Sequence, residues 1–351
     1  MQITFLVGNG FDISCGLNSS YAGFYDWYCK QEKSDKEHVN AFRDEINNDM
    51  KSGPKNWANF EEAMGKYTAK FSTDTSQHFI DCYEDAHKHL IKYLEIETSK
   101  FAGDLIDDEE AGKMREGLNN FYSELNSKEI MQLDSLFRAD QGNNTIIRFI
   151  SFNYTSVLDK CIEKAAKSPL RTWTDTNGHH RSLTIDRSVV HIHGRLTRHP
   201  VFGVDNEYQI ANKELLTVPD FAELMIKPKG VNALGELWHD DSAKCINSSD
   251  IICIWGMSMG ATDATWFSLI MDWLKAKENR QLIVFWHTDT PSNGVSNYLT
   301  LTNRRKAQTL ITDYSDLTRE KIEVIKQRIH IIENTKTVLR VKLRDNKGKE
   351  Q

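Results

Sequence analysis

The chain opens with Ile3-Thr-Phe-Leu-Val7, followed at once by Gly8-Asn9-Gly10-Phe11-Asp12. This unbroken apolar run, rich in β-forming residues, predicts a buried strand. Two glycines directly after the strand allow a tight turn and a close approach of the backbone to a ligand. A strand, a glycine turn and a helix start together point backbone N–H groups at a phosphate. A plain turn without a ligand is the alternative, because short motifs produce false positives.

The dinucleotide fingerprint is incomplete in this turn. Its third glycine is replaced by Ile13, and no strand ending in an acidic residue follows about twenty residues later. The ribose contact that is usual in dehydrogenases is therefore absent, and the turn taken alone is weak evidence for nucleotide binding.

Other buried strands are expected downstream, and most of them run into a polar or glycine-containing turn. They are 145–152 followed by Asn153-Tyr154-Thr155, 188–193 followed by Gly194, 201–205, 250–255 followed by Gly256-Met-Ser258-Met-Gly260 and Asp263, and 281–286. Near-continuous apolar runs are typical of parallel strands covered on both faces. Ligands of open α/β sheets bind at the carboxyl ends of the strands. The sequence therefore predicts an α/β fold, a Rossmann-like parallel sheet with one crevice at that edge.

Most of the remaining chain is expected to be helical. Residues from about 36 to 140 carry apolar side chains at steps of three to four and include no convincing strand, which indicates a helical insertion or subdomain. The aromatic stretch 21–29 is interpreted as helix packing against the sheet, and Glu61 and Glu62 as surface side chains. The sequence further predicts helices at 264–274, 304–309 and 318–328, strands at 330–333 and 338–343, and a polar tail from residue 344.

Asn153, His191 and His193 are the candidates for chemistry at the strand ends. Asn153 carries a donor and an acceptor and suits holding a ribose or a water; a helix N-cap is the competing interpretation. Alternation in a strand would place His191 and His193 on one face. A histidine before a glycine turn fits a general base. Structural burial and a partial metal site are the alternatives, although no acidic or cysteine partner is near in sequence and the usual zinc spacings are missing.

Composition limits the class of protein. With 351 residues, 39% hydrophobic and 27% charged, the chain predicts one large soluble domain with insertions, or two domains. A net charge of −6 argues against nucleic-acid binding. No apolar run long enough for a membrane span and no signal peptide are recognisable, so a cytoplasmic protein is expected. The six scattered cysteines are expected to be free thiols, and no metal is expected.

The order of these motifs resembles the bacterial AbiH abortive-infection family, which is similar to sirtuins and to sirtuin-like NAD hydrolases of antiphage defence. The resemblance covers nearly the whole chain. It implies a sirtuin-like Rossmann domain at 1–30 and 141–345, a helical insertion at 31–140 and a disordered tail at 346–351. NAD would be the substrate rather than a cofactor.

The resemblance also implies roles for individual residues. Gly8, Asn9, Gly10, Phe11 and Asp12 would cradle the pyrophosphate, Asn153 would position the nicotinamide ribose, and His193 would be the base, with His191 as second choice. Gly256, Ser258 and Asp263 would hold the adenosine half. The other binding residues expected are Tyr21, Tyr154, Thr155, Gly194 and Gly203.

Two departures from true sirtuins are visible in the sequence. The zinc module with paired C-x-x-C motifs is absent, and Phe152 replaces the glutamine that precedes the asparagine. Both departures favour hydrolysis or cyclisation of NAD over protein deacetylation. The expected function is an NAD glycohydrolase that depletes NAD in antiphage defence.

We expect a homo-oligomer, with a separate sensor or activator protein as a further partner, and neither nucleic acid nor membrane. The same crevice without catalysis would make a sensor of NAD or ADP-ribose-type nucleotides. A metal-dependent nuclease would need clustered carboxylates, whereas Asp12, Asp205 and Asp263 are dispersed in sequence.

Overall fold

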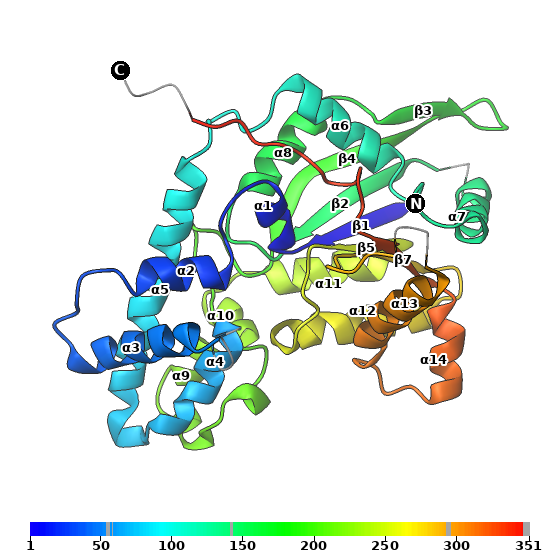
Figure 1. Ribbon diagram of the computed structural model, residues 1–351. Helices are drawn as coiled ribbons and strands as arrows, with labels where there is room; N and C mark the ends of the chain where they lie inside the picture. Colours follow the sequence, from blue (N-terminus) through cyan, green and yellow to red (C-terminus); the bar gives the residue numbers. More distant parts are fainter. Residues whose placement is uncertain (54–56, 58, 141–142, 293–295, 347–351) are drawn as a thin grey trace.

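The computed structural model describes residues 1–53, 57, 59–140, 143–292 and 296–346. Its strands are β1 (Gln2–Val7), β2 (Thr145–Ser151), β3 (Arg171–Thr174), β4 (His180–His191), β5 (Ile251–Trp255), β6 (Gln281–Trp286) and β7 (Ile329–Glu333). They form one seven-stranded sheet in the order β3-β4-β2-β1-β5-β6-β7 (Figure 1). All neighbours pair in parallel except β3 and β4, which are antiparallel. The expected α/β class with a largely parallel sheet is confirmed.

Helices cover both faces of this sheet and gather in a second group beside it (Figure 1). They are α1 (Gly10–Ser14), α2 (Tyr21–Tyr28), α3 (Glu37–Lys51), α4 (Phe60–Tyr67), α5 (Ser76–Ser99), α6 (Asp108–Asn119), α7 (Ser127–Ala139), α8 (Val157–Ala165), α9 (Phe221–Met225), α10 (Lys227–Ala233), α11 (Trp238–Ser248), α12 (Ala264–Ala276), α13 (Asn297–Thr312) and α14 (Arg319–Lys326), with 3₁₀ turns at Thr68–Lys70, Thr73–Thr75, Glu207–Gln209, Lys213–Thr217 and Ala261–Asp263. Apolar side chains of α6 and α8 share a core with Ile3, Phe5 and Val7 of β1. On the opposite face, Leu6 shares a core with α11 to α14. Burial on both faces explains the continuous apolar runs.

The strand order creates a reversal point beside β1. From β1 the chain builds β2 and β4 on one side and then returns to place β5 on the other side. In doubly wound folds ligands bind where the order reverses, outside the carboxyl ends of the strands. The turns that follow Val7 and Trp255 meet at this position, because Gly8 N donates to Trp255 O at 2.9 Å.

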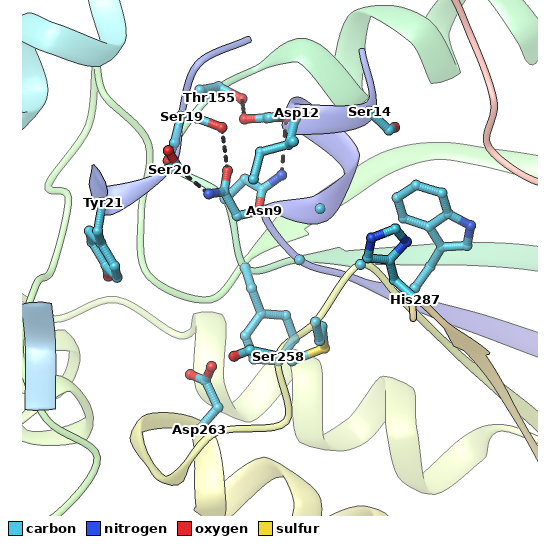
Figure 2. A pocket seen from close by; sticks show the side chains of 18 of the residues that line it. Asn9, Asp12, Ser14, Ser19, Ser20, Tyr21, Thr155, Ser258, Asp263 and His287 are labelled. Carbon is cyan, nitrogen blue, oxygen red and sulfur yellow. Dashed lines mark hydrogen bonds between the residues drawn. The ribbon is translucent and has the colours of Figure 1, made fainter. Parts of the chain in front are cut away.

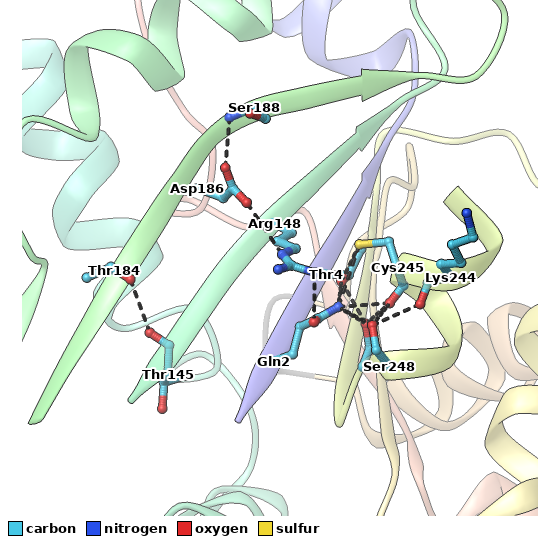
Figure 3. Close-up of polar contacts among 11 residues, drawn as sticks. Gln2, Thr4, Thr145, Arg148, Thr184, Asp186, Ser188, Lys244, Cys245 and Ser248 are labelled. Carbon is cyan, nitrogen blue, oxygen red and sulfur yellow. Dashed lines mark hydrogen bonds and ion pairs between the residues drawn. The ribbon is translucent and has the colours of Figure 1, made fainter. Parts of the chain in front are cut away.

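The amino ends of the strands are tied together by a polar cluster at the opposite edge of the sheet (Figure 3). The side chain of Gln2 donates to Cys245 O and to Ser248 Oγ, both at 2.9 Å, and accepts from Arg148 at 3.0 Å. Arg148 in turn pairs with Asp186 at 3.4 Å. These contacts connect β1, β2 and β4 to α11 and stabilise this edge of the sheet. The cavity described below lies at the other edge, where the strands have their carboxyl ends.

The helical group beside the sheet has its own core. Helices α2 to α5 and the segment 202–226 bury their aromatic and aliphatic side chains against one another. Phe24, Tyr25 and Tyr28 of α2 belong to this core, so the aromatic stretch packs as expected, but against helices rather than against the sheet. No strand occurs within the described part of 31–140, while α6 and α7 of that range pack on the sheet. The division at residues 31–140 stays a prediction.

Three strand predictions were wrong in detail. Residues 201–205 form only an isolated bridge between Val204 and Ile226, and 338–343 form no strand although Val338, Leu339, Val341 and Leu343 are buried. The strand predicted at 188–193 is the end of the longer β4, which stops at His191. The hairpin partner β3 was missed because it is a largely exposed edge strand with little apolar character.

Within the described ranges, no helix has both the length and the apolar character needed to cross a membrane. In the expected tail, Asn346 N donates to Lys100 O at 2.9 Å, and residues 347–351 lie outside the described residues, as does the predicted boundary at residue 141.

Candidate functional site

A cavity of about 850 Å³ lies at the carboxyl edge of the sheet (Figure 2). Most of the residues predicted for the site line it, namely Gly8, Asn9, Gly10, Asp12, Tyr21, Asn153, Tyr154, Thr155, His193, Gly256, Ser258 and Asp263. Figure 2 shows Tyr21 and His287 on opposite sides of the pocket, with Asn9 and Ser258 between them. The fold therefore brings together turns that are far apart in the sequence.

Three predicted binding residues do not line this cavity. Phe11 packs edge-on against Trp255 inside the core. Gly194 and Gly203 have φ values of 77° and 145°, and a Cβ on either would lie 2.2–2.3 Å from a backbone carbonyl oxygen. Close backbone packing accounts for both glycines, and their assignment to ligand binding stays a prediction.

Asp12 is the centre of the polar group at the β1 and β2 ends. Its carboxylate accepts from Asn153 Nδ2 at 3.1 Å and from Thr155 Oγ1 at 2.6 Å. Burial raises the pKa of Asp12 to about 6, although the hydrogen bonds from Thr155 and Asn153 oppose the shift. Asn153 is thereby held with Oδ1 buried and without a partner among the described residues. The N-cap of α8 is Ser156, so the capping interpretation of Asn153 was wrong.

His191 is fully engaged by protein groups. Its Nδ1 lies 2.8 Å from Asn153 O, and its Nε2 lies 2.8 Å from Asp159 Oδ2. Asp159 also pairs with Arg195 at 2.9 Å. His191 does not line the cavity. Its ring therefore supports the backbone of Asn153, and both of its nitrogens are taken by protein partners.

His193 lies in the wall of the cavity beside a carboxylate. It follows the end of β4 in a turn and lines the cavity, with Nε2 3.3 Å from Asp263 Oδ1. Its Nδ1 is buried and has no partner among the described residues. Burial and the charge of Lys227 together lower the pKa of His193 to about 4, although Asp263 opposes the shift. The two histidines thus have separate carboxylate partners, which sequence proximity did not reveal.

A buried lysine completes the site. Lys227 Nζ lies 3.1 Å from Glu61 Oε2 and 3.2 Å from Asp263 Oδ1, and Lys227 is 1% exposed. Burial alone would lower the Lys227 pKa, but the charges of Asp263 and Glu61 raise it above its ordinary value. For Asp263 the opposing effects of burial and of Lys227 leave the pKa well below the usual range.

The surface interpretation of Glu61 was wrong. Glu61 is 6% exposed and lines the cavity, whereas Glu62 points outward and pairs with Lys66. Burial raises the Glu61 pKa, and the charge of Lys227 opposes this. No local motif marks Lys227, because its partners come from α4 and from the turn after β5.

The carboxylates of the cavity take their donors from protein side chains. Asp12 and Asp263 are engaged as described, and Asp205 does not line the cavity but accepts from Thr265 Oγ1 at 2.8 Å. Over the ranges that the structure describes, no three side chains of His, Cys, Asp or Glu are grouped so that they would hold a metal ion.

The glycines of the first turn are required by the second turn. A Cβ on Gly10 would lie 2.6 Å from Gly256 Cα, and one on Gly8 would lie 2.7 Å from Gly256 O. Gly10 N also donates to Gly256 O at 2.8 Å. The absence of side chains therefore lets the β1 and β5 turns touch and form the floor of the cavity.

Gly10→Ala is expected to lower the free energy of unfolding by about 1–3 kcal/mol, because the added methyl group forces the two turns apart. The matched control is Gly112→Ala in α6, where nothing lies within 4 Å and φ is not positive. The control is expected to raise stability by about 0.5–1 kcal/mol. Urea unfolding of both variants measures the difference, and equal stabilities would contradict the packing argument.

The comparison with known proteins agrees with the arrangement of the motifs. No curated protein matches the chain. Residues 4–286, from β1 to the end of β6, match the family described as bacteriophage abortive infection AbiH. This match includes all the motif residues from Gly8 to Asp263. The chain therefore belongs to the AbiH family of bacteriophage abortive infection.

Proposed function

We propose that this protein cleaves the bond between nicotinamide and ribose in NAD and acts in abortive infection by depleting NAD. One observation carries the proposal. Asn153 and His193 both line the cavity, and Asn153 Oδ1 and His193 Nδ1 are buried without a partner among the described residues. Buried acceptors are costly without a donor. Ribose hydroxyls and a water are donors of the kind that this pair would accept.

The chemistry asks little of the protein beyond orientation and one proton acceptor. Nicotinamide leaves as a neutral molecule from a cationic pyridinium, through a transition state resembling an oxocarbenium ion, as in other glycoside cleavages. His193 is neutral at pH 7 because its pKa is about 4. Since the carboxylate of Asp263 can only accept, we assign the ring proton to Nε2, which leaves Nδ1 as the acceptor. His193 would accept a proton from a ribose hydroxyl or from the attacking water.

Asn153 would fix the ribose. Its Nδ2 is bound by Asp12 and its backbone carbonyl by His191, so its Oδ1 has a defined direction. Orientation of this kind lowers the entropic part of a barrier. In this proposal Asp263 belongs beside His193 rather than in the adenosine half, because the structure places it against the imidazole.

The length of the crevice fits an extended ligand. From the β4 end to the β6 end the sheet has four strand spacings, roughly 19 Å at about 4.8 Å each. Cavity-lining residues follow β1, β2, β4 and β5 and include Phe285 and Trp286 of β6. A dinucleotide would extend along this edge with its nicotinamide end near His193. Control by self-assembly or by a separate activator belongs to the same proposal, because uncontrolled NAD loss would harm the host.

The test is release of nicotinamide from NAD by the purified protein, followed by chromatography. Release that is absent with heat-denatured protein and persists after extensive chelation is expected. Binding of NAD or ADP-ribose without release, also in infected-cell extract, would instead identify a nucleotide sensor. Release that required an added metal ion would contradict the proposed metal-independent chemistry.

We expect kcat/KM for NAD to fall at acid pH with a midpoint near 6, set by Asp12. Above its pKa of about 6, the Asp12 carboxylate accepts from Asn153 Nδ2 and holds this amide. Protonation weakens this acceptor, and below the midpoint the rate falls by roughly tenfold per pH unit if the ionised form is essential. Asp12→Asn is expected to be slow and independent of pH from 5 to 8. An unchanged acid limb in that variant would assign the titration to another group.

A further inference from the structure

The far end of the cavity, away from His193, carries a basic side chain that the motifs did not indicate. After β7 the chain returns across the carboxyl edge, and Asn334, Thr335 and Arg340 join Trp255, Phe285 and Trp286 in lining the cavity. This end is aromatic, and its cationic side chain is Arg340. The carboxylates that line the cavity are Asp12, Glu61 and Asp263, and all three are engaged by protein donors.

The guanidinium of Arg340 is available to a ligand. Its Nε donates to Thr335 O at 3.0 Å, and its Cζ lies 5.4 Å from the centre of the Trp255 ring. No ion pair joins Arg340 to a carboxylate within the described part of the chain. Its two outer nitrogens have no hydrogen-bond partner among the described residues, so they present a planar fork of donors, which fits the oxygens of a phosphate.

The segment that carries Arg340 is held in place. Trp255 Nε1 donates to Val338 O at 3.0 Å, and the hydroxyls of Thr335 and Thr337 both donate to Glu124 at 2.7 Å. Leu339, directly before Arg340, has φ of 53°. A non-glycine residue in this region persists only where its surroundings fix it, and such residues cluster at ligand sites. Arg340 is therefore positioned before any ligand arrives.

We propose that Arg340 binds a phosphate group of the nucleotide ligand at the β6–β7 end of the crevice. The proposal uses the crevice of the proposed function but not its chemistry. None of the described residues that line this end of the cavity is acidic, and an arginine in place of the acidic ribose contact is what accommodates a 2′-phosphate in dinucleotide folds. The shared requirement is a phosphate, either the pyrophosphate or a 2′-phosphate.

Calorimetric titration of the full chain with ADP, adenosine 2′,5′-bisphosphate and adenosine tests this role. Arg340→Met is expected to weaken binding of the two phosphate probes by about 10- to 100-fold, because a charge-assisted hydrogen bond is lost, and to change adenosine binding little. Arg340→Lys is expected to recover part of the affinity, since it keeps the charge but not the fork. A larger loss for the bisphosphate than for ADP would assign Arg340 to the 2′-phosphate. An equal loss would assign it to the 5′-phosphate that both probes share, and a larger loss for ADP to the second phosphate of the pyrophosphate.

Arg344→Met is the matched control, because Arg344 lies on the same segment, pairs with Asp104 at 3.5 Å and does not line the cavity. It should bind all three probes as the wild type does, and thermal unfolding verifies that both variants are folded. Equal affinities of Arg340→Met and wild type for ADP and the bisphosphate, or no binding of either probe by the wild type, would overturn the proposal. These measurements need no turnover, so they stand whether or not NAD is cleaved.

Discussion

His193→Ala is expected to lower the rate of nicotinamide release from NAD by about 100- to 10,000-fold, the usual effect of losing a general base. His193 lines the cavity, its buried Nδ1 has no partner among the described residues, and the Asp263 carboxylate lies against its other nitrogen. Binding of NAD should change much less, because the proposed ligand would span the whole crevice. Single-turnover kinetics, together with a binding isotherm, separates the two effects.

Two variants distinguish a base from a structural histidine. His193→Gln keeps a polar side chain of similar reach without a titratable nitrogen, so it should fold, bind NAD and fail in turnover. His239→Asn is the control, because the His239 ring lies 6.4 Å from that of His193 but does not line the cavity. If His239→Asn lost as much activity as His193→Ala, or if His193→Gln stayed active, the assignment of the base would be wrong.

The sequence predicted the sheet because parallel strands covered on both faces are marked by their composition. Six of the seven strands in the described sheet were predicted at least in part, and the structure buries three of them, β1, β5 and β6, almost completely. The polar residues after the predicted strands then had to meet, since parallel strands share one carboxyl edge. Asp12, Asn153 and His193 came together for that reason. The residue types in and directly after each strand were therefore enough to predict that these side chains meet.

Pairing across long separations could not be predicted in the same way. The partners of His193 and Lys227 are Asp263 and Glu61, at separations of 70 and 166 residues, and nothing local to Lys227 indicates burial. Glutamate is seldom buried without a partner, so Glu61 was assigned to the surface. A single sequence does not show which residues pair across such long separations. The edge strand β3 was missed for a related reason, because its identity depends on pairing with β4 rather than on its own residues.

An apolar run also led to a wrong strand prediction where the chain is buried without pairing with another strand. Residues 338–343 have the composition of a strand, but they fill the core next to Trp255 as an irregular segment. Arg340 lies within this stretch, with its neighbours Leu339 and Val341 buried and its own side chain at the cavity. A segment can therefore satisfy the hydrophobic pattern of a strand and serve instead to position a polar group.

Lys227→Met is expected to lower the free energy of unfolding by about 3–5 kcal/mol at pH 7, because Glu61 and Asp263 would remain buried without their counter-charge. Lys66→Met is the matched control. Lys66 pairs with Glu62 on the exposed side of α4, where an ion pair contributes about 0–1 kcal/mol. Urea unfolding at several pH values measures both variants against the wild type.

The pH dependence identifies the cause of this loss. Without Lys227, burial would hold the pKa of Glu61 above its unfolded value of 4.5, so the folded variant would bind a proton more tightly than the unfolded chain. The variant should therefore gain stability relative to the wild type as pH falls toward 4.5 and lose it as pH rises through the folded pKa. A deficit that is the same at all pH values would point to lost packing of the lysine stem instead. Since Lys227 joins α4, α10 and the turn after β5, a deficit that depends on pH would show that the ion pairs fix the helical group to the cavity.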